Sequence, residues 1–157
     1  MADVLNKEQR RLNMSRIRST NTKPEMLVRR GLHAVGLRYR LHVKGMPGTP
    51  DLVFPRSRAV ILVHGCFWHG HQCHLFKPPQ TQSVFWMEKI SKNVQRDQAA
   101  ISALSNQDWR ILVVWECSLR GKQRFSTDSV IERCRRFIIQ EQLPYHEITS
   151  LDAQSIV

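Results

Sequence analysis

The segment that most restricts the fold of this chain is 60–76, with the sequence VILVHGCFWHGHQCHLF. It begins as a continuous apolar run, which is typical of a strand buried on both faces in the middle of a sheet. It then places four histidines, two cysteines and three large aromatic residues within a few positions. A plain hydrophobic core does not require that mixture of metal ligands, titratable groups and rings. We therefore expect the function to reside where this strand ends.

The charge of the chain points to a polyanionic partner. Its 157 residues suffice for one domain with a full core, and 24 Lys and Arg face 13 Asp and Glu, for a formal net charge of +11. A solubilising surface or a ribosome-associated protein would also be basic. Because aromatic and polar side chains accompany the charge, nucleic acid is the favoured partner.

The beginning of the sequence, MADVLNKEQRRLN, is charged and has no apolar core of a signal peptide. No apolar run approaches the roughly 20 residues that span a bilayer. We expect a cytoplasmic protein whose four cysteines are thiols or metal ligands rather than disulfides.

Hydrophobic periodicity and turn residues predict one domain over 1–157, an α/β sandwich around a small mixed sheet. Segment 1–19 is expected to be an arm lying on nucleic acid, with a frayed terminus as the alternative, and 144–157 a tail. The predicted helices are 6–19, 22–35, 83–106 and 126–142, and the predicted strands are 37–43, 51–54, 59–63 and 110–115.

Cysteines and a histidine form a candidate structural zinc site of the Cys₃His type. Two of the cysteines follow predicted strands, and strands of like direction would bring them together. Buried free cysteines are the alternative, and His74 and Cys134 are rival ligands, although Cys134 fits the apolar stripe of the last helix. The expected ligands are Cys66, His71, Cys73 and Cys117.

A candidate catalytic centre lies beside them. Asp51 begins a strand and can hold Mg²⁺ against a phosphate, and His64 and His69 can act as acid or base near neutral pH. The chemistry would be metal-assisted attack of water on a phosphodiester. Glu25 already closes a capping box at the start of the second helix, so its catalytic role needs further support.

Aromatic side chains next to these residues suggest a surface for stacking on bases. Phe67 and Trp68 lie between the expected zinc ligands, and Trp86 lies in the first turn of the long helix. A loop stiffened by zinc could wedge such rings between bases and kink the duplex. Packing of the rings onto the sheet is the alternative, and it is the expectation for Trp109 and Trp115, which flank an apolar strand.

Several motifs together resemble the very short patch repair (Vsr) endonucleases, which nick DNA at T:G mismatches. The resemblance covers roughly residues 10–140. Its motifs are Asn13-Met14-Ser15-Arg16-Ile17, Thr22-Lys23-Pro24-Glu25, Pro47-Gly48-x-Pro50-Asp51, His64-Gly65-Cys66-Phe67-Trp68-His69-Gly70-His71-x-Cys73, Phe85-Trp86-x-x-Lys89-Ile90-x-x-Asn93-x-x-Arg96-Asp97 and Val114-Trp115-Glu116-Cys117.

The resemblance implies a restriction-endonuclease-like fold and a nick 5′ of the mispaired T that deamination of 5-methylcytosine leaves. It implies Mg²⁺ on Asp51 and on the backbone carbonyl of Val63, with His69 as the base and Glu25 and His64 assisting at the phosphate. It also implies zinc on the four ligands above. The DNA contacts that it suggests are Phe67, Trp68, Trp86, Met14, Lys89, Asn93 and Arg96.

One departure concerns the carboxylates. Related nucleases have Glu-x-Lys on the strand after the Pro-Asp, whereas this chain has Leu62-Val63-His64. The competing predictions are a restriction endonuclease for matched duplex and a non-enzymatic zinc-bearing DNA-binding protein. We expect a monomer on double-stranded DNA, with mismatch-repair proteins as the further partners that the resemblance suggests.

Overall fold

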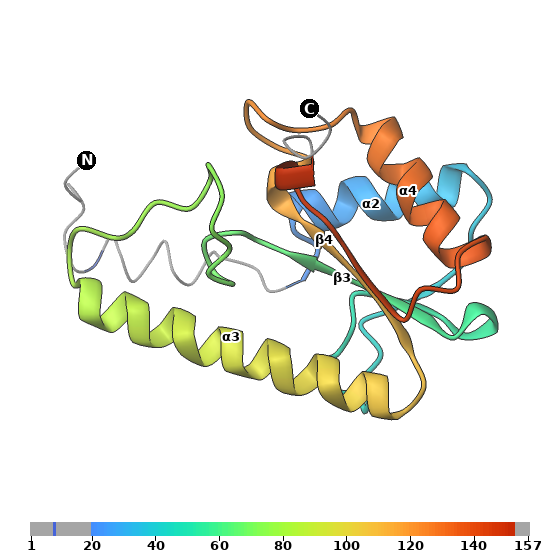
Figure 1. The fold of residues 1–157 in the computed structure, drawn as a ribbon, viewed down its shortest axis with the longest axis horizontal. Coiled ribbons are helices and arrows are strands. Elements are labelled where there is room, and N and C mark those ends of the chain that lie inside the picture. Colours follow the sequence, from blue (N-terminus) through green and yellow to red (C-terminus); the bar gives the residue numbers. More distant parts are fainter. Residues whose placement is uncertain (1–7, 9–19, 153–157) are drawn as a thin grey trace.

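A computed structural model describes residue 8 and residues 20–152 of the chain. The predicted helix 6–19, apart from residue 8, and Met14 lie outside the described residues. In the described part, a mixed sheet is covered by helices on both faces (Figure 1). The predicted α/β class is therefore confirmed.

The sheet has five strands, and their order across the sheet is their order along the chain. The first and second strands pair antiparallel, as do the second and third, whereas the third, fourth and fifth strands run parallel to one another. The register pairs His64 with Trp115, so the carboxyl ends of the third and fourth strands lie side by side. The strands are β1 (Arg40–Leu41), β2 (Leu52–Phe54), β3 (Ala59–His64), β4 (Arg110–Trp115) and β5 (Tyr145–Ile148).

Alternation along the central strands divides the core in two, because successive side chains of a strand point to opposite faces. Ala59 and Ile61 of β3 pack with α2 (Lys23–Ala34) and α4 (Thr127–Ile139), whereas Val60 and Leu62 pack with α3 (Ser83–Asn106). A strand buried on both faces reads as a continuous apolar run, as predicted for this segment. Among the described residues, no helix combines the length and apolar character needed to cross a membrane.

Helix α2 begins where its capping residues predict. Thr22 Oγ1 accepts the backbone N–H of Glu25 at 3.3 Å, which satisfies one free donor of the first turn. The Glu25 carboxylate accepts the backbone N–H of Asn21 at 3.1 Å, one residue before the position that a capping box uses. The carboxylate thus reaches past the helix end and remains available to other groups.

Two strand predictions differ from the structure. The predicted strand 37–43 is reduced to Arg40–Leu41, because His42 has a left-handed backbone (φ 44°) that ends the extended run. Residues after Pro144, for which the sequence pattern predicts no element, form β5. Only Ile148 of β5 is buried, so β5 has no apolar alternation from which a strand could be predicted. The hydrogen bonds between β5 and β4 make this segment a strand.

Candidate functional site

A cluster of sulfur and imidazole ligands lies at the carboxyl ends of β3 and β4. Cys66 and Cys117 each follow their strand by two residues, and the parallel register places both at the same edge of the sheet. The loop after β3 adds His71 and Cys73. One ligand atom of each of these four residues lies within 4.8 Å of all the others. The four residues predicted as zinc ligands therefore come together in space.

The spacing of this cluster fits a tetrahedral metal ion. Zinc bonds of 2.3 Å to sulfur and 2.0–2.1 Å to nitrogen place two ligand atoms about 3.6 Å apart at a tetrahedral angle. Cys66 Sγ and Cys117 Sγ lie 3.5 and 3.7 Å from His71 Nδ1. The rival His74 is not in this cluster, and Cys134 is fully buried in the core below α4, as its position in the apolar stripe predicts.

Hydrogen bonding between the two buried cysteines favours a thiolate, the form that binds metals. The contact with Cys66 lowers the pKa of the Cys117 thiol, and the same contact raises the pKa of Cys66. Cys117 Sγ also accepts the backbone N–H of Ser150 at 3.3 Å. The negative charge of the pair is therefore concentrated on Cys117.

A second cluster contains two carboxylates and a histidine. His42 Nε2 lies 3.1 Å from both carboxylate oxygens of Glu25 and 3.9 Å from Asp51 Oδ1. Asp51 Oδ2 accepts the backbone N–H of Val63 at 2.8 Å. Arg29 Nη1 forms an ion pair with Glu25 Oε2 at 3.1 Å, and Glu25 is only 1% exposed. The structure thus brings Glu25 from α2 to Asp51, although 26 positions separate them in the sequence.

The carboxylates of this second cluster repel each other. The pKa of Asp51 is raised from 3.8 to about 7, chiefly by burial and further by the neighbouring Glu25, and the hydrogen bond from the Val63 N–H opposes this shift. Two carboxylates and a histidine with ligand atoms within 4.8 Å of one another can also hold a cation. A divalent cation would favour the charged form of Asp51, which burial and the nearby Glu25 both disfavour.

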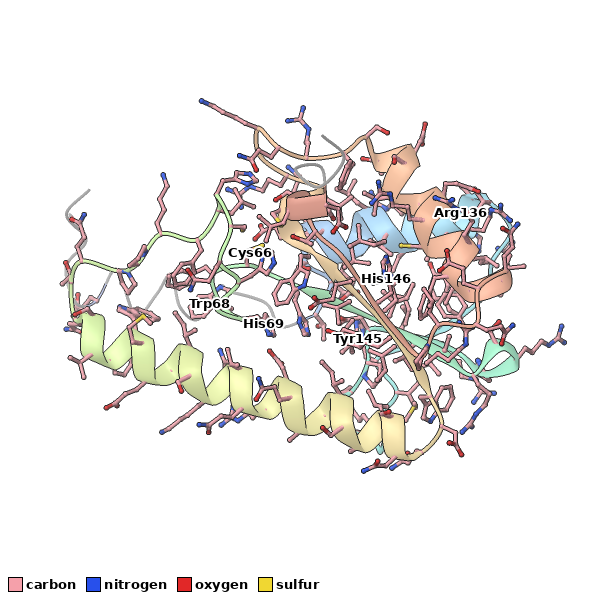
Figure 2. All side chains as sticks on the ribbon, viewed as in Figure 1. Cys66, Trp68, His69, Arg136, Tyr145 and His146 are labelled. Atoms are coloured by element: carbon pink, nitrogen blue, oxygen red, sulfur yellow. The ribbon has the colours of Figure 1, made fainter. Side chains whose placement is uncertain are left out.

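A third cluster pairs the two histidines with an unexpected carboxylate. Its His69 lies on the loop after β3, on the side that faces α3 (Figure 2). The rings of His64 and His69 stack in parallel, with centroids 3.9 Å apart. His69 Nδ1 is hydrogen-bonded to Asp97 Oδ2 of α3, and His64 Nε2 lies 4.0 Å from Asp97 Oδ1. Burial and then the neighbouring His69 lower the pKa of His64 to about 3, so His64 is neutral near pH 7.

Gly70 allows the loop to approach α3 closely enough for this contact. Its backbone is left-handed (φ 64°), and a Cβ atom there would lie 3.0 Å from Ile90 Cγ2 and 3.3 Å from Val94 Cγ2. Glycine adopts such a backbone without strain and leaves room for both helix side chains. Gly70 therefore lets His69 reach Asp97.

The aromatic side chains gather beside the histidines and outside both core clusters of the described residues. The ring centroids of Trp68 lie 5.1 Å from Phe67 and 5.7 Å from Trp86. Lys89 Nζ lies 5.7 and 5.9 Å from the two indole rings, and the Asn93 amide donates to the Trp68 carbonyl at 3.0 Å. These five residues form one surface, to which α3 contributes Trp86, Lys89 and Asn93.

Three predicted residues stand apart from that surface. Arg96 lies exposed on α3 and is not among the residues that contact the aromatic side chains in the described part of the chain. Trp115 is 8% exposed and packs in the core, and Trp109 packs against the same core cluster, as expected for both.

Sequence reasoning missed His42 and Asp97. His42 falls in an alternating strand pattern and resembles any polar residue on the solvent side. Asp97 had a usable signal, because it follows Asn93 by four residues and so shares its helix face. That face was expected to contact DNA, and its approach to the loop was not predicted.

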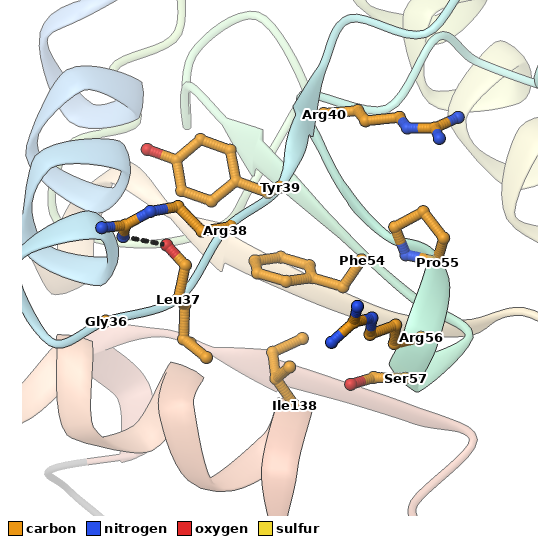
Figure 3. A pocket seen from close by; sticks show the side chains of 10 residues that line it. All are labelled: Gly36, Leu37, Arg38, Tyr39, Arg40, Phe54, Pro55, Arg56, Ser57 and Ile138. Atoms are coloured by element: carbon orange, nitrogen blue, oxygen red, sulfur yellow. Dashed lines mark hydrogen bonds between the residues drawn. The ribbon is translucent and has the colours of Figure 1, made fainter.

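The best-formed pockets of the described residues lie elsewhere. The larger one, of about 650 Å³, opens at the far end of β2, beside Phe54 and Arg56 (Figure 3). Neither it nor the second pocket, near Ile101 and Tyr145, contains a predicted site residue.

Comparison with known proteins finds a matching family and several similar enzymes. The family described as "DNA mismatch endonuclease Vsr" matches residues 2–75. The "DNA mismatch endonuclease Vsr" of Escherichia coli (strain K12) is 45% identical over 141 residues, which cover 90% of each chain. The "Type II nicking enzyme V.XorIIP" of Xanthomonas oryzae pv. oryzae is 50% identical over 119 residues, covering 76% of this chain and 88% of the relative. The "Type II nicking enzyme V.NmeAIP" of Neisseria meningitidis is 41% identical over 122 residues, or 78% and 87%.

Proposed function

The chain belongs to the Vsr family of DNA mismatch endonucleases, and we propose that it nicks double-stranded DNA 5′ of the mispaired T in T:G mismatches left by deamination of 5-methylcytosine. The observation that carries the proposal is the adjacency of two clusters. Asp51 accepts a hydrogen bond from the backbone N–H of Val63. The residue after Val63, His64, stacks on His69. A carboxylate pair and an imidazole pair thus flank one point where a scissile phosphate can lie.

Asp51, Glu25 and the backbone carbonyl of Val63 are the groups that would hold Mg²⁺. Hard oxygen ligands suit this ion, and the N–H and C=O of a strand residue point to the same side in an antiparallel pairing. When bound, Mg²⁺ would stabilise the charge that develops on the phosphate oxygens. Glu25 supplies from α2 the second carboxylate that Leu62-Val63-His64 lacks, and His42 and Arg29 hold it in place.

His69 is the proposed general base. Asp97 accepts a hydrogen bond from Nδ1–H, which leaves Nε2 unprotonated and free to take the proton of the attacking water. His64, with its pKa near 3, is a poor base and is suited to donate a hydrogen bond to the phosphate. No covalent intermediate is required, because water is the nucleophile.

We expect Asp97→Asn to lower the nicking rate about 10²- to 10⁴-fold, because the neutral amide no longer favours the required tautomer and orientation of His69. His69→Ala should lower the rate by a similar factor. Single-turnover nicking of a T:G duplex, measured from pH 5 to 9, gives these rates. Since the two residues act as one unit, the double variant should lose little more than either single variant.

Asp128→Asn, at an exposed position in the first turn of α4, is the matched control and should nick at the normal rate. If the fold-loss of nicking rate in the double variant equals the product of the two single-variant losses, the shared role of His69 and Asp97 is contradicted.

The aromatic surface is the proposed reader of the mismatch. Phe67, Trp68 and Trp86 would insert between base pairs, and base–aromatic stacking contributes about 1–3 kcal/mol per base. A T:G pair is easier to open than a matched pair, so insertion favours the mismatch. Lys89 and Asn93 would hold the rings and approach the DNA from α3. The mixed sheet with helices on both faces is compatible with the restriction-endonuclease-like fold that we propose.

Zinc is the proposed ion for Cys66, His71, Cys73 and Cys117. Four ligands with no open position are typical of a structural zinc site. The loop between them carries both Trp68 and His69, so a rigid loop would place the inserting ring and the base together. The enzyme would thereby couple opening of the mismatch to cleavage.

The purified protein with Mg²⁺ should nick a T:G duplex on the T strand and leave the matching T:A duplex intact. The test uses duplexes with randomised flanks, and the cleavage products are sequenced to locate the nick. Cutting of matched duplex would favour the restriction-endonuclease alternative. Binding without cleavage under any divalent metal would favour the non-enzymatic alternative.

A further inference from the structure

The residues that follow β5 lie against the sulfur and imidazole cluster. Thr149 is 8% exposed and Ser150 is fully buried. Ile148, the last residue of β5, is buried in the core and pairs with Val114 of β4, so the chain enters this region in a fixed register. The predicted tail thus supplies one wall of the cluster.

The Thr149 hydroxyl has three neighbours at hydrogen-bond distance. Its Oγ1 lies 3.3 Å from His71 Nε2, 3.4 Å from Cys117 Sγ and 3.3 Å from the backbone nitrogen of Leu151. A hydroxyl donates one hydrogen bond and accepts two. The Leu151 N–H can only donate, and a Cys117 thiolate can only accept. The arrangement is complete when Oγ1 donates to Cys117 and accepts from His71 and Leu151.

This assignment fixes the tautomer of His71. If Nε2 carries the proton that it donates to Thr149, then Nδ1 is unprotonated. His71 Nδ1 is the atom that lies 3.5 and 3.7 Å from the two cysteine sulfurs. Its lone pair therefore points toward the sulfur ligands, as metal binding requires. Trp115 stacks on the His71 ring at 4.2 Å and limits its rotation.

We propose that Thr149 is a positioning residue of this metal cluster. Its hydroxyl holds His71 in the Nδ1-binding tautomer and stabilises the Cys117 thiolate, without touching the metal. The inference rests on the proposed zinc site. Groups that hydrogen-bond to metal ligands orient them, and their loss typically lowers metal affinity 10- to 100-fold.

The backbone of the same segment is also anchored. The Thr149 N–H donates to Asp152 Oδ2 at 3.3 Å, and Asp152 Oδ2 lies 3.6 Å from Arg133 of α4. The Ser150 N–H donates to Cys117 Sγ. These backbone contacts survive substitution of the Thr149 side chain, so a variant at this position isolates the hydroxyl.

The experiment compares Thr149→Val, which keeps the shape and removes the hydroxyl, with Thr149→Ser, which keeps the hydroxyl. Thr127→Val, at an exposed position on α4, is the matched control. Each full-length protein is depleted of metal and titrated with Zn²⁺ against a competing chelator, and with Co²⁺ to record the absorption of the thiolate–cobalt centre.

Thr149→Val should bind Zn²⁺ about 10- to 100-fold more weakly and should shift the Co²⁺ absorption bands, whereas Thr149→Ser and Thr127→Val should match the unmodified protein. Equal affinity and equal spectra for Thr149→Val would overturn the inference. A loss that Thr149→Ser shares would overturn it too, because packing and not the hydroxyl would then matter. If Thr149→Val does not fold, Thr149→Ala against Thr149→Ser gives the same comparison.

Two outcomes separate this inference from the proposed function. An unmodified protein that holds no metal overturns both the zinc site and the role of Thr149. An unmodified protein that holds zinc but does not nick a T:G duplex overturns the activity alone, and the metal titrations still decide the role of Thr149.

Discussion

Asp51→Asn is expected to lower the rate of T:G nicking by at least about 10³-fold, because it removes the charge of the proposed Mg²⁺ ligand. Each tenfold loss corresponds to about 1.4 kcal/mol of barrier. DNA affinity should be retained, since the aromatic surface and the basic residues are unchanged. Single-turnover nicking and gel-shift titration on the same duplex measure the two quantities. Nicking at the normal rate would remove Asp51 from the mechanism.

The same substitution should stabilise the protein in Mg²⁺-free buffer. Burial raises the folded-state pKa of Asp51 from 3.8 to about 7, so the native state binds a proton more tightly than the unfolded state. The contribution of protonated Asp51 to the free energy of unfolding is fully present below about pH 4 and is lost as the pH rises through 7. Asn carries no charge and avoids the loss, which is at most about 4 kcal/mol.

Urea unfolding at pH 8 should therefore show Asp51→Asn to be more stable than the unmodified protein, and the difference should vanish near pH 4. Asp128→Asn, the exposed control, should show no such pH dependence. A variant that is less stable at pH 8 would contradict the raised pKa and the charge repulsion with Glu25.

Loss of the sulfur and imidazole cluster should have the largest effect on stability. We expect Cys117→Ser to contain far less than one zinc per chain and to unfold at a temperature at least about 10 °C lower, because structural zinc contributes binding free energies of about 10–16 kcal/mol in small domains. Elemental analysis and thermal unfolding measure the two effects. Nicking should fail as well, since the loop carries His69.

Cys134→Ala is the matched control for this prediction. Cys134 is buried in the core and is not in the cluster, so its replacement should leave zinc at one per chain and lower the stability only by the loss of a small buried side chain. Retention of zinc by Cys117→Ser would contradict the ligand set. Loss of zinc from Cys134→Ala would contradict the exclusion of Cys134 from the ligand set.

The residues of the candidate site differ in how far the sequence could identify them. Cys117 could be assigned to the sulfur and imidazole cluster from the sequence, because cysteine is rare in this chain and Cys117 closely follows a predicted strand. Asp97 had only the helix face that it shares with Asn93, and His42 and Thr149 have no distinguishing pattern in the sequence. Their roles depend on contacts with His69, Glu25 and His71, which lie 28, 17 and 78 positions away in the sequence.

The sequence by itself determined the three described long helices and the central strands, because periodicity, caps and turn residues act within a few positions of each other. It also determined the chemical types gathered in 60–76, the strand with its crowded loop. The division of that segment into metal ligands, a histidine pair and aromatic side chains was also predicted from the sequence. Only the tertiary structure decided which distant residues complete the groups, with Asp97 beside His69 and His42 beside Glu25. It also decided that β5, which has almost no apolar pattern, completes the sheet. These outcomes depend on pairing and packing between distant segments, and no local pattern records such contacts.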